Sequence, residues 1–223
     1  MNILQTTDLK KYYGTEPNIT KALDGVTLSI EEGEFVAIVG TSGSGKSTLL
    51  NMMGGLDTPT SGSIKVKGKE LSKLKDEQLT IFRRRNIGFI FQNYNLVPVL
   101  NVYENIVLPV ELDGDTVDKR FMDEVVKMLA LDGKLNSMPN NLSGGQQQRV
   151  AIARALVYKP ANISASEQTG KMDWRTSRDV HGLLKVTSQK FHQTLVMITH
   201  NNEIAQLAAR IIRIEAGKIA LWQ

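Results

Sequence analysis

Residues 36–50 read VAIVGTSGSGKSTLL, and the rest of the chain can be interpreted outward from them. The apolar run Val36–Val39 predicts a buried strand, the glycine-rich segment 40–45 predicts a loop, and Lys46 opens a helix. This is the G-x-x-x-x-G-K-[ST] pattern in the strand–loop–helix context that it requires. Glycines let the backbone wrap closely around a phosphate, while successive N–H groups and the positive end of the helix dipole point at the anion. The stretch therefore predicts a phosphate-binding loop for a nucleotide.

The polar residues of this loop suit the same chemistry. Lys46 can reach the β- and γ-phosphates, and the Ser47 hydroxyl can be a ligand of Mg²⁺. The alternative is a glycine-rich turn that happens to precede a helix, and the full motif with correct flanks argues against it. The nucleotide-binding residues predicted for the loop are Gly40, Thr41, Ser42, Gly43, Ser44, Gly45, Lys46, Ser47 and Thr48.

The bulk composition is that of an ordinary globular protein, and 223 residues suit one compact domain, 1–223, with room for a subdomain. No apolar run is long enough to cross a bilayer, and the first residues lack the apolar region of a signal peptide. The absence of cysteine excludes a disulfide framework and a cysteine-based metal site. These observations predict a cytoplasmic chain.

The charge balance is mildly basic, with 27 Lys and Arg against 23 Asp and Glu and a formal net charge of +4. Such an excess suits a nucleotide binder or a surface near anionic lipid headgroups, and it does not by itself indicate nucleic acid. No basic run is interleaved with aromatic residues, and the short run Arg83–Arg85 is typical of a solvated helix end. We therefore expect no nucleic-acid partner.

The two sides of the phosphate loop differ in their patterns. Residues 1–35 contain two strand-like runs separated by a turn-rich segment, which predicts an antiparallel β region. After residue 36 strands alternate with helices, which predicts an α/β fold with a parallel sheet. The expected strands are 64–67 at a sheet edge, 86–92, a strand that ends near residue 167, 194–200 and a closing hairpin in 210–222, and the expected helices are 75–84, 116–131, 175–189 and 202–208.

A second glycine motif, Leu142-Ser143-Gly144-Gly145-Gln146, runs directly into a helical pattern. The phosphate loop alone is compatible with kinases, GTPases and many ATPases, and this LSGGQ motif narrows the choice. In chain order come the loop, Phe91-Gln92, LSGGQ, a strand end with Glu167 and a strand end with His200. This series resembles the ATP-binding cassette of an ABC transporter over essentially the whole chain. The segments GGLDTPTSG, IGFIFQNYNLVP and NLSGGQQQRVAIARAL are most similar to the MacB/LolD-type subfamily.

The resemblance implies a role for each matching residue. Tyr13 would stack on adenine, Gln92 would meet Mg²⁺ and the attacking water, and Glu167 would be the general base. His200 would contact the γ-phosphate, and Asp173 would cross a dimer interface. The implied cofactors are ATP and Mg²⁺, the implied catalytic set is Glu167, His200, Lys46 and Gln92, and the implied protein groups on the metal are Ser47 and Gln92.

The resemblance also implies partners. The signature residues Ser143, Gly144, Gly145 and Gln146 of one subunit would cap the γ-phosphate held by the other subunit's loop, so a head-to-tail homodimer is expected. Cassettes of this family are cytoplasmic, peripheral at the inner face of the cell membrane, and serve separate integral-membrane permeases. The subgroup drives lipoprotein release, macrolide or peptide export, or peptide sensing. A helical subdomain is expected at about 93–150.

The segment from Tyr94 to Tyr103 mixes loop-type residues with large apolar ones, and Pro98 and Pro109 interrupt the apolar stretch to which it belongs. One interpretation is core packing beneath the helical subdomain, because apolar loop residues are often buried. The other is a groove that receives a cytoplasmic helix of the permease, as the family implies, with Tyr94 and Leu96 in contact with that helix. The sequence leaves both interpretations open.

The chain departs from the family pattern where the family has four apolar residues followed by Asp-Glu. Here the strand reads NISASE from residue 162, so Ser166 takes the place of the aspartate. Asn162 and Ser164 also place polar groups where a central parallel strand should be almost continuously apolar. The lost negative charge predicts weaker use of Mg²⁺ and slower turnover, with ATP binding retained.

Two functions from different classes remain. The first is an ATP-hydrolysing subunit of an ABC transporter that energises a membrane permease, and Glu167 and His200 favour it. The second is a nucleotide-binding dimerisation module with little turnover, a degenerate or engineered copy, and Ser166 favours it. A DNA-repair or chromosome ATPase would need a long coiled-coil insertion between Gln92 and Leu142, and this interval is too short for one.

Overall fold

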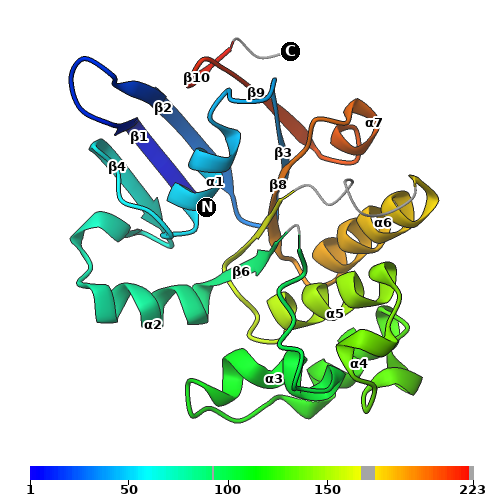
Figure 1. Ribbon diagram of the computed structural model, residues 1–223. Helices are drawn as coiled ribbons and strands as arrows, with labels where there is room; N and C mark the ends of the chain where they lie inside the picture. The colour runs from blue at the N-terminus through cyan, green and yellow to red at the C-terminus, as the bar shows by residue number, and fades with distance from the viewer. Residues whose placement is uncertain (92, 167–173, 221–223) are drawn as a thin grey trace.

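Two β-sheets of different kinds organise the molecule (Figure 1). The computed structural model describes residues 1–91, 93–166 and 174–220, with the side chains of 174–177 excepted. The first sheet is antiparallel, in the order β2-β1-β4-β5, and confirms the β region expected at the start of the chain. β4 has β1 on one side and the short β5 on the other, so it is not the edge strand that its alternating pattern predicted. The strands of this sheet are β1 (Asn2–Tyr13), β2 (Thr20–Glu31), β4 (Ser61–Val66) and β5 (Lys69–Glu70).

The second, central sheet has the order β10-β9-β3-β8-β7-β6. Five of its strands are parallel, and β10 returns antiparallel to β9 as the predicted closing hairpin. Every residue of β3, β7 and β8 is buried, as expected for central strands covered on both faces. The predicted parallel α/β sheet is therefore confirmed. Its strands are β3 (Phe35–Val39), β6 (Ile87–Ile90), β7 (Asn162–Ala165), β8 (Thr194–Ile198), β9 (Arg210–Glu215) and β10 (Lys218–Ile219).

The helices include one that the sequence did not predict. Helix α3 contains Pro109, which removes one backbone donor near the helix end. The helix forms nevertheless, because Asn101 and Glu104 make a capping box at its start and its apolar face is buried. No helix in the described part of the chain is long and apolar enough to span a membrane. The helices are α1 (Lys46–Met53), α2 (Asp76–Asn86), α3 (Val102–Glu111), α4 (Lys119–Met128), α5 (Gly144–Leu156), α6 (Trp174–Lys190) and α7 (Asn202–Ala205), with 3₁₀ turns at Leu71–Lys73, Asp132–Lys134 and Pro139–Asn141.

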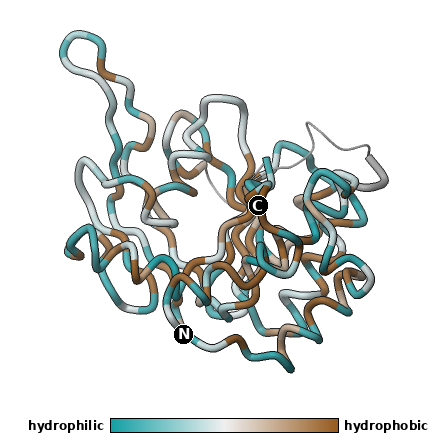
Figure 2. The backbone as a smooth tube through the Cα atoms, turned by 60° about the horizontal axis from the view of Figure 1, so that its bottom comes forward, coloured by the Kyte–Doolittle hydropathy of each residue, from teal (hydrophilic) through white to brown (hydrophobic). Residues whose placement is uncertain are grey.

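Two large apolar clusters pack against opposite faces of the central sheet. One contains side chains of α3, α4 and α5 together with Leu195 and Met197 of β8. The other contains side chains of α1 and of the antiparallel sheet together with Val196 and Ile198 of the same strand. Figure 2 shows this pattern as hydrophobic strands in the interior and hydrophilic segments around them. The sheet is therefore fixed from both sides, and so are the loops that leave its carboxyl edge.

Candidate nucleotide-binding site

Motif-bearing segments leave the carboxyl edge of the central sheet at neighbouring positions. Strands β3, β8, β7 and β6 lie side by side in that order. The phosphate loop follows β3, His200 follows β8, and Ser166 directly follows β7. His200 is exposed, and the N–H of the buried Thr199 before it donates to the Ile38 carbonyl of β3 at 3.1 Å. Ligands of open α/β sheets bind outside the carboxyl ends of the strands, so these distant segments converge where a ligand is expected.

Three residues with predicted roles, Gln92, Glu167 and Asp173, lie outside the described residues. Their roles stay predictions. The neighbouring Ser166 is described, and both its N–H and its hydroxyl donate to the Ile90 carbonyl, at 3.0 and 3.3 Å. Ser166, which the family resemblance aligns with an aspartate, is therefore held at the end of β6, the strand that leads toward Gln92.

The phosphate loop is shaped by its glycines and by its own lysine. Gly45 has a φ of +103°, and a β-carbon there would lie 2.3 Å from the Ala22 carbonyl oxygen, so only glycine fits. Lys46 Nζ donates to the carbonyl oxygens of Gly40 and Thr41, at 2.8 and 2.6 Å. Phosphate oxygens bind an ammonium more strongly than neutral carbonyls do. A nucleotide could therefore take over these contacts without a change in the fold of the loop.

A buried hydroxyl in the loop supports the same ligand. Ser44 is 4% exposed, and its Oγ atom has no hydrogen-bond partner. An unsatisfied buried group of this kind costs about 1–3 kcal/mol, which an anion accepting that hydrogen bond would recover. Ser47 is exposed at the start of α1 and could hold Mg²⁺ together with phosphate oxygens. Within residues 1–91, 93–166 and 174–220, no group of three or more His, Cys, Asp or Glu side chains is placed to bind a metal ion. A Mg²⁺ ion beside Ser47 would therefore need oxygens from the nucleotide phosphates as well.

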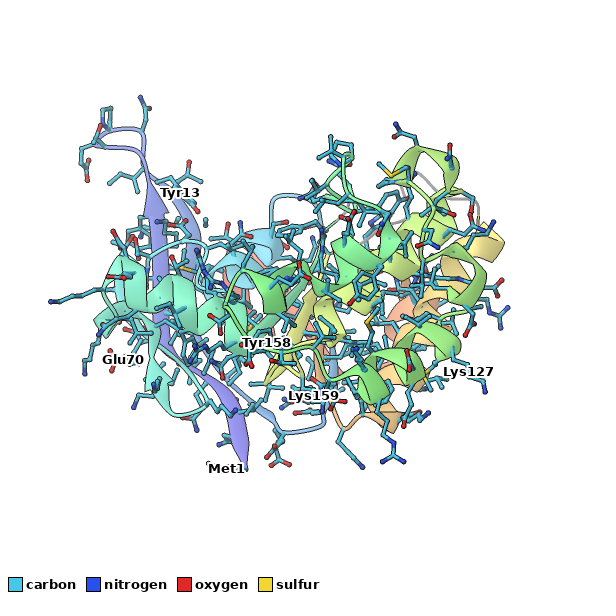
Figure 3. The ribbon with its side chains drawn as sticks, turned by 90° about the horizontal axis from the view of Figure 1, so that it is seen from below. Met1, Tyr13, Glu70, Lys127, Tyr158 and Lys159 are labelled. Atoms are coloured by element: carbon cyan, nitrogen blue, oxygen red, sulfur yellow. The ribbon has the colours of Figure 1, made fainter. Side chains whose placement is uncertain are left out.

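The aromatic side chain at the end of β1 has a defined setting. Tyr13 is 43% exposed, its hydroxyl donates to Asp57 Oδ2 at 2.8 Å, and the Lys11 ammonium lies 4.9 Å from the ring centroid. Burial and the hydrogen bond with Asp57 raise the pKa of Tyr13, while a hydrogen bond with Thr48 lowers it. The contact with Thr48 brings the ring beside α1, the helix that begins at the phosphate loop. Figure 3 shows Tyr13 at the end of its strand, next to the β1–β2 loop.

The LSGGQ residues form the start of α5. The Gln146 N–H donates to Ser143 Oγ at 3.3 Å, and the Ser143 N–H donates to Gln146 Oε1 at 2.9 Å. This reciprocal capping box fixes the first turn of the helix, whose positive end suits an anion. The turn borders a hollow of about 250 Å³, lined by Ser143, Gly145, Gln146, Arg149 and Asp179.

The two glycine motifs belong to different layers of the molecule. Side chains of α5 pack in the apolar cluster on one face of the central sheet, and side chains of α1 pack in the cluster on the opposite face (Figure 1). The two helix N-termini that could hold phosphate are thus held apart by the sheet.

An apolar groove of about 540 Å³ lies beside the helical layer, lined in part by Phe89, Phe91, Val97, Leu108 and Pro109. Tyr94, which the family reading placed in contact with a partner, is only 8% exposed, and Leu96 packs against the core. Core packing is therefore correct for these two side chains, while their neighbours Asn95 and Val97 line the groove.

The turn that separates these residues is held by an arginine that the sequence analysis missed. Tyr94 and Asn95 have φ values of +60° and +48°, in the left-handed region, which is uncommon for tyrosine and adopted more readily by asparagine. Arg154 of α5 donates to both of their carbonyl oxygens, each at 2.7 Å. The groove wall thus depends on contacts between Arg154 and residues 59 and 60 positions earlier in the chain. No local pattern reveals such a contact.

The floor of the groove also touches the nucleotide-binding half. The rings of Phe89 and Phe91 stack with centroids 5.2 Å apart. A β-carbon on Gly54, the residue that ends α1, would lie 1.8 Å from Phe89 Cζ. Phe89 therefore packs directly on the backbone at the end of the phosphate-loop helix, and its ring would have to move if residue 54 carried a side chain.

An ionic cluster closes the rim of the groove between α2, α3 and α5. Asp113 accepts from Arg84 at 2.9 Å, from Arg85 at 2.6 Å and from the Tyr158 hydroxyl at 2.5 Å. The hydrogen bond from Tyr158 lowers the pKa of Asp113, and Arg85 lowers it further. Burial, followed by the hydrogen bonds to Asp113 and Asp115, raises the pKa of Tyr158 to about 12.

Comparison with known proteins agrees with this geometry. Residues 23–170 match the family model described as ABC transporter. The chain is 45% identical over 221 residues to the macrolide export ATP-binding/permease protein MacB of Mannheimia succiniciproducens, covering 98% of this chain and 34% of MacB. It is 41% identical over 220 residues to the lipoprotein-releasing system ATP-binding protein LolD of Geobacter metallireducens, covering 98% of each.

A solved structure is similar over nearly the full length. It is a dimeric structure of a post-hydrolysis state of the ATP-binding cassette MJ0796 bound to ADP and Pi, with a TM-score of 0.87 and 40% identity, covering 99% of this chain and 97% of that one. The chain belongs to the ABC transporter family. Within that family it corresponds to the ATP-binding cassette, an ABC-type ATPase of the kind found in MacB and LolD, and it spans about a third of the length of MacB.

Proposed function

We propose that this chain is the ATP-binding and ATP-hydrolysing part of an ABC transporter that energises a membrane permease of the lipoprotein-release, macrolide-export or peptide-export type. The observation that carries the proposal is the geometry of the phosphate loop. Lys46 donates to two carbonyl oxygens that phosphate oxygens could replace, and the buried Ser44 hydroxyl has no hydrogen-bond partner. The names of MacB and LolD support the type of transporter.

The chemistry proposed for this edge of the sheet is phosphoryl transfer to water. Lys46 exchanges the Gly40 and Thr41 carbonyls for phosphate oxygens, and the loop N–H groups hold the remaining charge. Mg²⁺, when bound, would neutralise charge on the β- and γ-phosphates, with Ser47 and Gln92 as its protein ligands. Glu167 orients the attacking water as general base, and His200 contacts the γ-phosphate.

A second chain is proposed to complete each site. The signature turn of α5 lies on the opposite side of the central sheet from α1, so it suits a nucleotide held by another copy. Ser143, Gly144, Gly145 and Gln146 of one copy would cap the γ-phosphate on the loop of the other, with Asp173 at the interface. The dimeric state of the MJ0796 structure supports this head-to-tail homodimer.

The apolar groove is proposed as the surface that receives a cytoplasmic helix of the permease. The groove has an open, largely apolar lining, which favours this role. It lies beside the helical layer, which we propose as a subdomain of about residues 93–150 within a single domain 1–223. Such docking would hold a cytoplasmic chain at the inner face of the membrane, as a peripheral subunit of its permease. Val97 and Asn95, rather than Tyr94 and Leu96, are the contacts proposed from this segment.

Nucleotide titration tests the proposal. The parent chain should bind ATP and ADP, and Lys46→Ala should lose most of this affinity without a change in circular dichroism, because Lys46 is at the start of α1 and outside the core. Equal ATP affinity in the two proteins would refute the site. ATP hydrolysis by the parent, with Glu167→Gln as the control for the general base, tests turnover.

A second candidate, a nucleotide-binding dimerisation module with little turnover, is favoured by one observation. Ser166 is neutral, and its hydroxyl is bonded to the Ile90 carbonyl. A carboxylate could not donate that hydrogen bond and would turn away from the carbonyl. Ser166→Asp should therefore shift hydrolysis to lower Mg²⁺ and raise the rate by about 10–100-fold.

The Mg²⁺ titration separates the two candidates. A parent rate above that of Glu167→Gln supports the transporter ATPase. A parent rate equal to that control, with ATP binding intact, supports the dimerisation module. Overlapping curves for the parent and Ser166→Asp would mean that Ser166 does not occupy the place of the aspartate.

A further inference from the structure

Three side chains at the end of β1 form a closed cluster, which we call the base platform: Lys11, Tyr13 and Asp57. Asp57 accepts from Lys11 Nζ through Oδ1 at 2.7 Å and from the Tyr13 hydroxyl through Oδ2 at 2.8 Å. The same Lys11 ammonium lies 4.9 Å from the centroid of the Tyr13 ring. Each member of the cluster thus contacts both of the others.

The carboxylate of the platform is itself held in place. The Thr58 N–H donates to Asp57 Oδ1 at 2.7 Å, and Lys11 Nζ also donates to the Thr58 carbonyl at 2.8 Å. The Thr60 N–H donates to the Lys10 carbonyl at 2.8 Å, which attaches the same turn to β1. Burial alone would raise the pKa of Asp57, but hydrogen bonds from Lys11 and Tyr13 outweigh it and leave the pKa lowered. Asp57 is therefore a fixed anion at neutral pH.

The platform is also connected to the phosphate loop. Asp57 follows shortly after the C-terminal end of α1, whose first residue is Lys46. Tyr13 contacts Thr48 in the first turn of the same helix. A base on Tyr13 and phosphates on the loop would therefore both be positioned relative to α1. The distance between the base-binding and phosphate-binding residues is then set by one short helix.

We propose that Asp57 and Lys11 are positioning residues for adenine. The hydrogen bond that the Tyr13 hydroxyl donates to Asp57 fixes the tilt of the ring, and the Lys11 ammonium lies over one face, so the proposal places the base on the other face. A cation on one face of a phenol ring draws π-electron density toward itself, which favours an electron-rich purine on the other face. The inference rests on the proposed function, because it takes Tyr13 as the group that stacks on adenine.

A folding effect of each variant must be separated from a binding effect. Tyr13 is 43% exposed, but the Lys11–Asp57 pair is partly buried, with the side chains 13% and 28% exposed. Removing one partner of such a pair lowers stability, because the other charge stays partly buried without its counter-charge. Circular dichroism and Tm are therefore measured for each variant, and an unchanged affinity for triphosphate shows that the phosphate loop is intact.

The test compares two ligands, ATP and inorganic triphosphate, on the same set of purified full-length variants. Asp57→Asn, Lys11→Met and Tyr13→Phe should each weaken ATP by about 3–10-fold, a part of the stacking energy, and leave triphosphate unchanged. The double variant Tyr13→Phe with Asp57→Asn should weaken ATP by less than the product of the two single effects, because Asp57 acts in part through the hydroxyl that is already missing. Asp8→Asn is the matched control, since Asp8 is a carboxylate on β1 that also forms an ion pair with a lysine of β1, Lys10, at 3.3 Å.

The outcomes separate this inference from the proposed site. If Tyr13→Ala weakens ATP but not triphosphate while Asp57→Asn and Lys11→Met change neither, the positioning role is wrong and the adenine site stands. If Asp57→Asn weakens both ligands equally, Asp57 shapes the phosphate loop and the inference is overturned. If Tyr13→Ala leaves ATP affinity unchanged, the adenine site and the positioning role fail together.

Discussion

The polar pair inside β7 gives a prediction with opposite signs for two closely related variants. Asn162 and Ser164 are both polar, although they are 0% exposed and belong to a central strand that lies between β8 and β6. Ile163 and Ala165 pack in the helical-side cluster, so the polar pair faces the opposite side of the sheet. Asn162 Nδ2 donates to Ser164 Oγ at 3.4 Å, while Asn162 Oδ1 is buried without a partner.

The magnitude follows from that unsatisfied carbonyl oxygen. A buried acceptor left unpaired costs about 1–3 kcal/mol, and replacing both partners by apolar groups removes the cost. Asn162→Val combined with Ser164→Ala should therefore raise the free energy of unfolding by about 1–3 kcal/mol, which for a chain of this size raises Tm by about 2–4 °C per kcal/mol. Ser164→Ala alone should lower stability by about 1–3 kcal/mol, because it leaves the buried Asn162 amide without its acceptor.

Denaturant unfolding of the nucleotide-free chain measures both variants against the parent. Equal slopes against denaturant, with shifted midpoints, would assign the change to stability rather than to a changed denatured state. A double variant with a midpoint at or below that of the parent would refute the reasoning, since the unpaired Oδ1 would then cost nothing.

Three further predictions concern other parts of the chain. Gly45→Ala should abolish ATP binding with the fold retained, because its β-carbon would lie 2.3 Å from the Ala22 carbonyl oxygen, and nucleotide titration with circular dichroism checks this. Tyr158 has a folded pKa raised to about 12, so its contribution to stability is present below about pH 10 and is lost as pH rises toward 12. Tyr158→Phe should lack that part of the alkaline loss in pH-dependent unfolding. Val97→Glu should reduce stimulation of ATP hydrolysis by the permease at unchanged ATP affinity, and unchanged stimulation would contradict the groove assignment.

Features that depend on short, local sequence patterns were predictable. The phosphate loop, the two sheets and the helix after LSGGQ follow from short motifs and apolar periodicity, and the structure has them at the expected positions. Helix α3 was missed because Pro109 was taken as an interruption, whereas a proline near the end of a well-capped, buried helix is tolerated. β4 was misplaced at an edge, because a two-residue partner strand leaves almost no signal in the sequence.

Features that depend on long-range contacts were not predictable. The sequence left open whether Tyr94 packs in the core or contacts a partner, and the structure buries its side chain, while Arg154 donates to its carbonyl oxygen. The contact of Asp57 with Tyr13 joins residues 44 positions apart and has no periodic pattern. The roles predicted for Gln92, Glu167 and Asp173 came from the family resemblance, and these residues lie outside the described part of the chain.

The packing of Phe89 on Gly54 means that the depth of the groove is set from the nucleotide-binding half. The ring rests on backbone where any β-carbon would lie 1.8 Å from Cζ, so a larger residue at position 54 would lift the ring into the groove. Such a substitution would make the groove shallower without altering a residue that lines it. A docked helix and the end of α1 would thus press on the two sides of one aromatic ring, and the size of residue 54 governs how closely they approach.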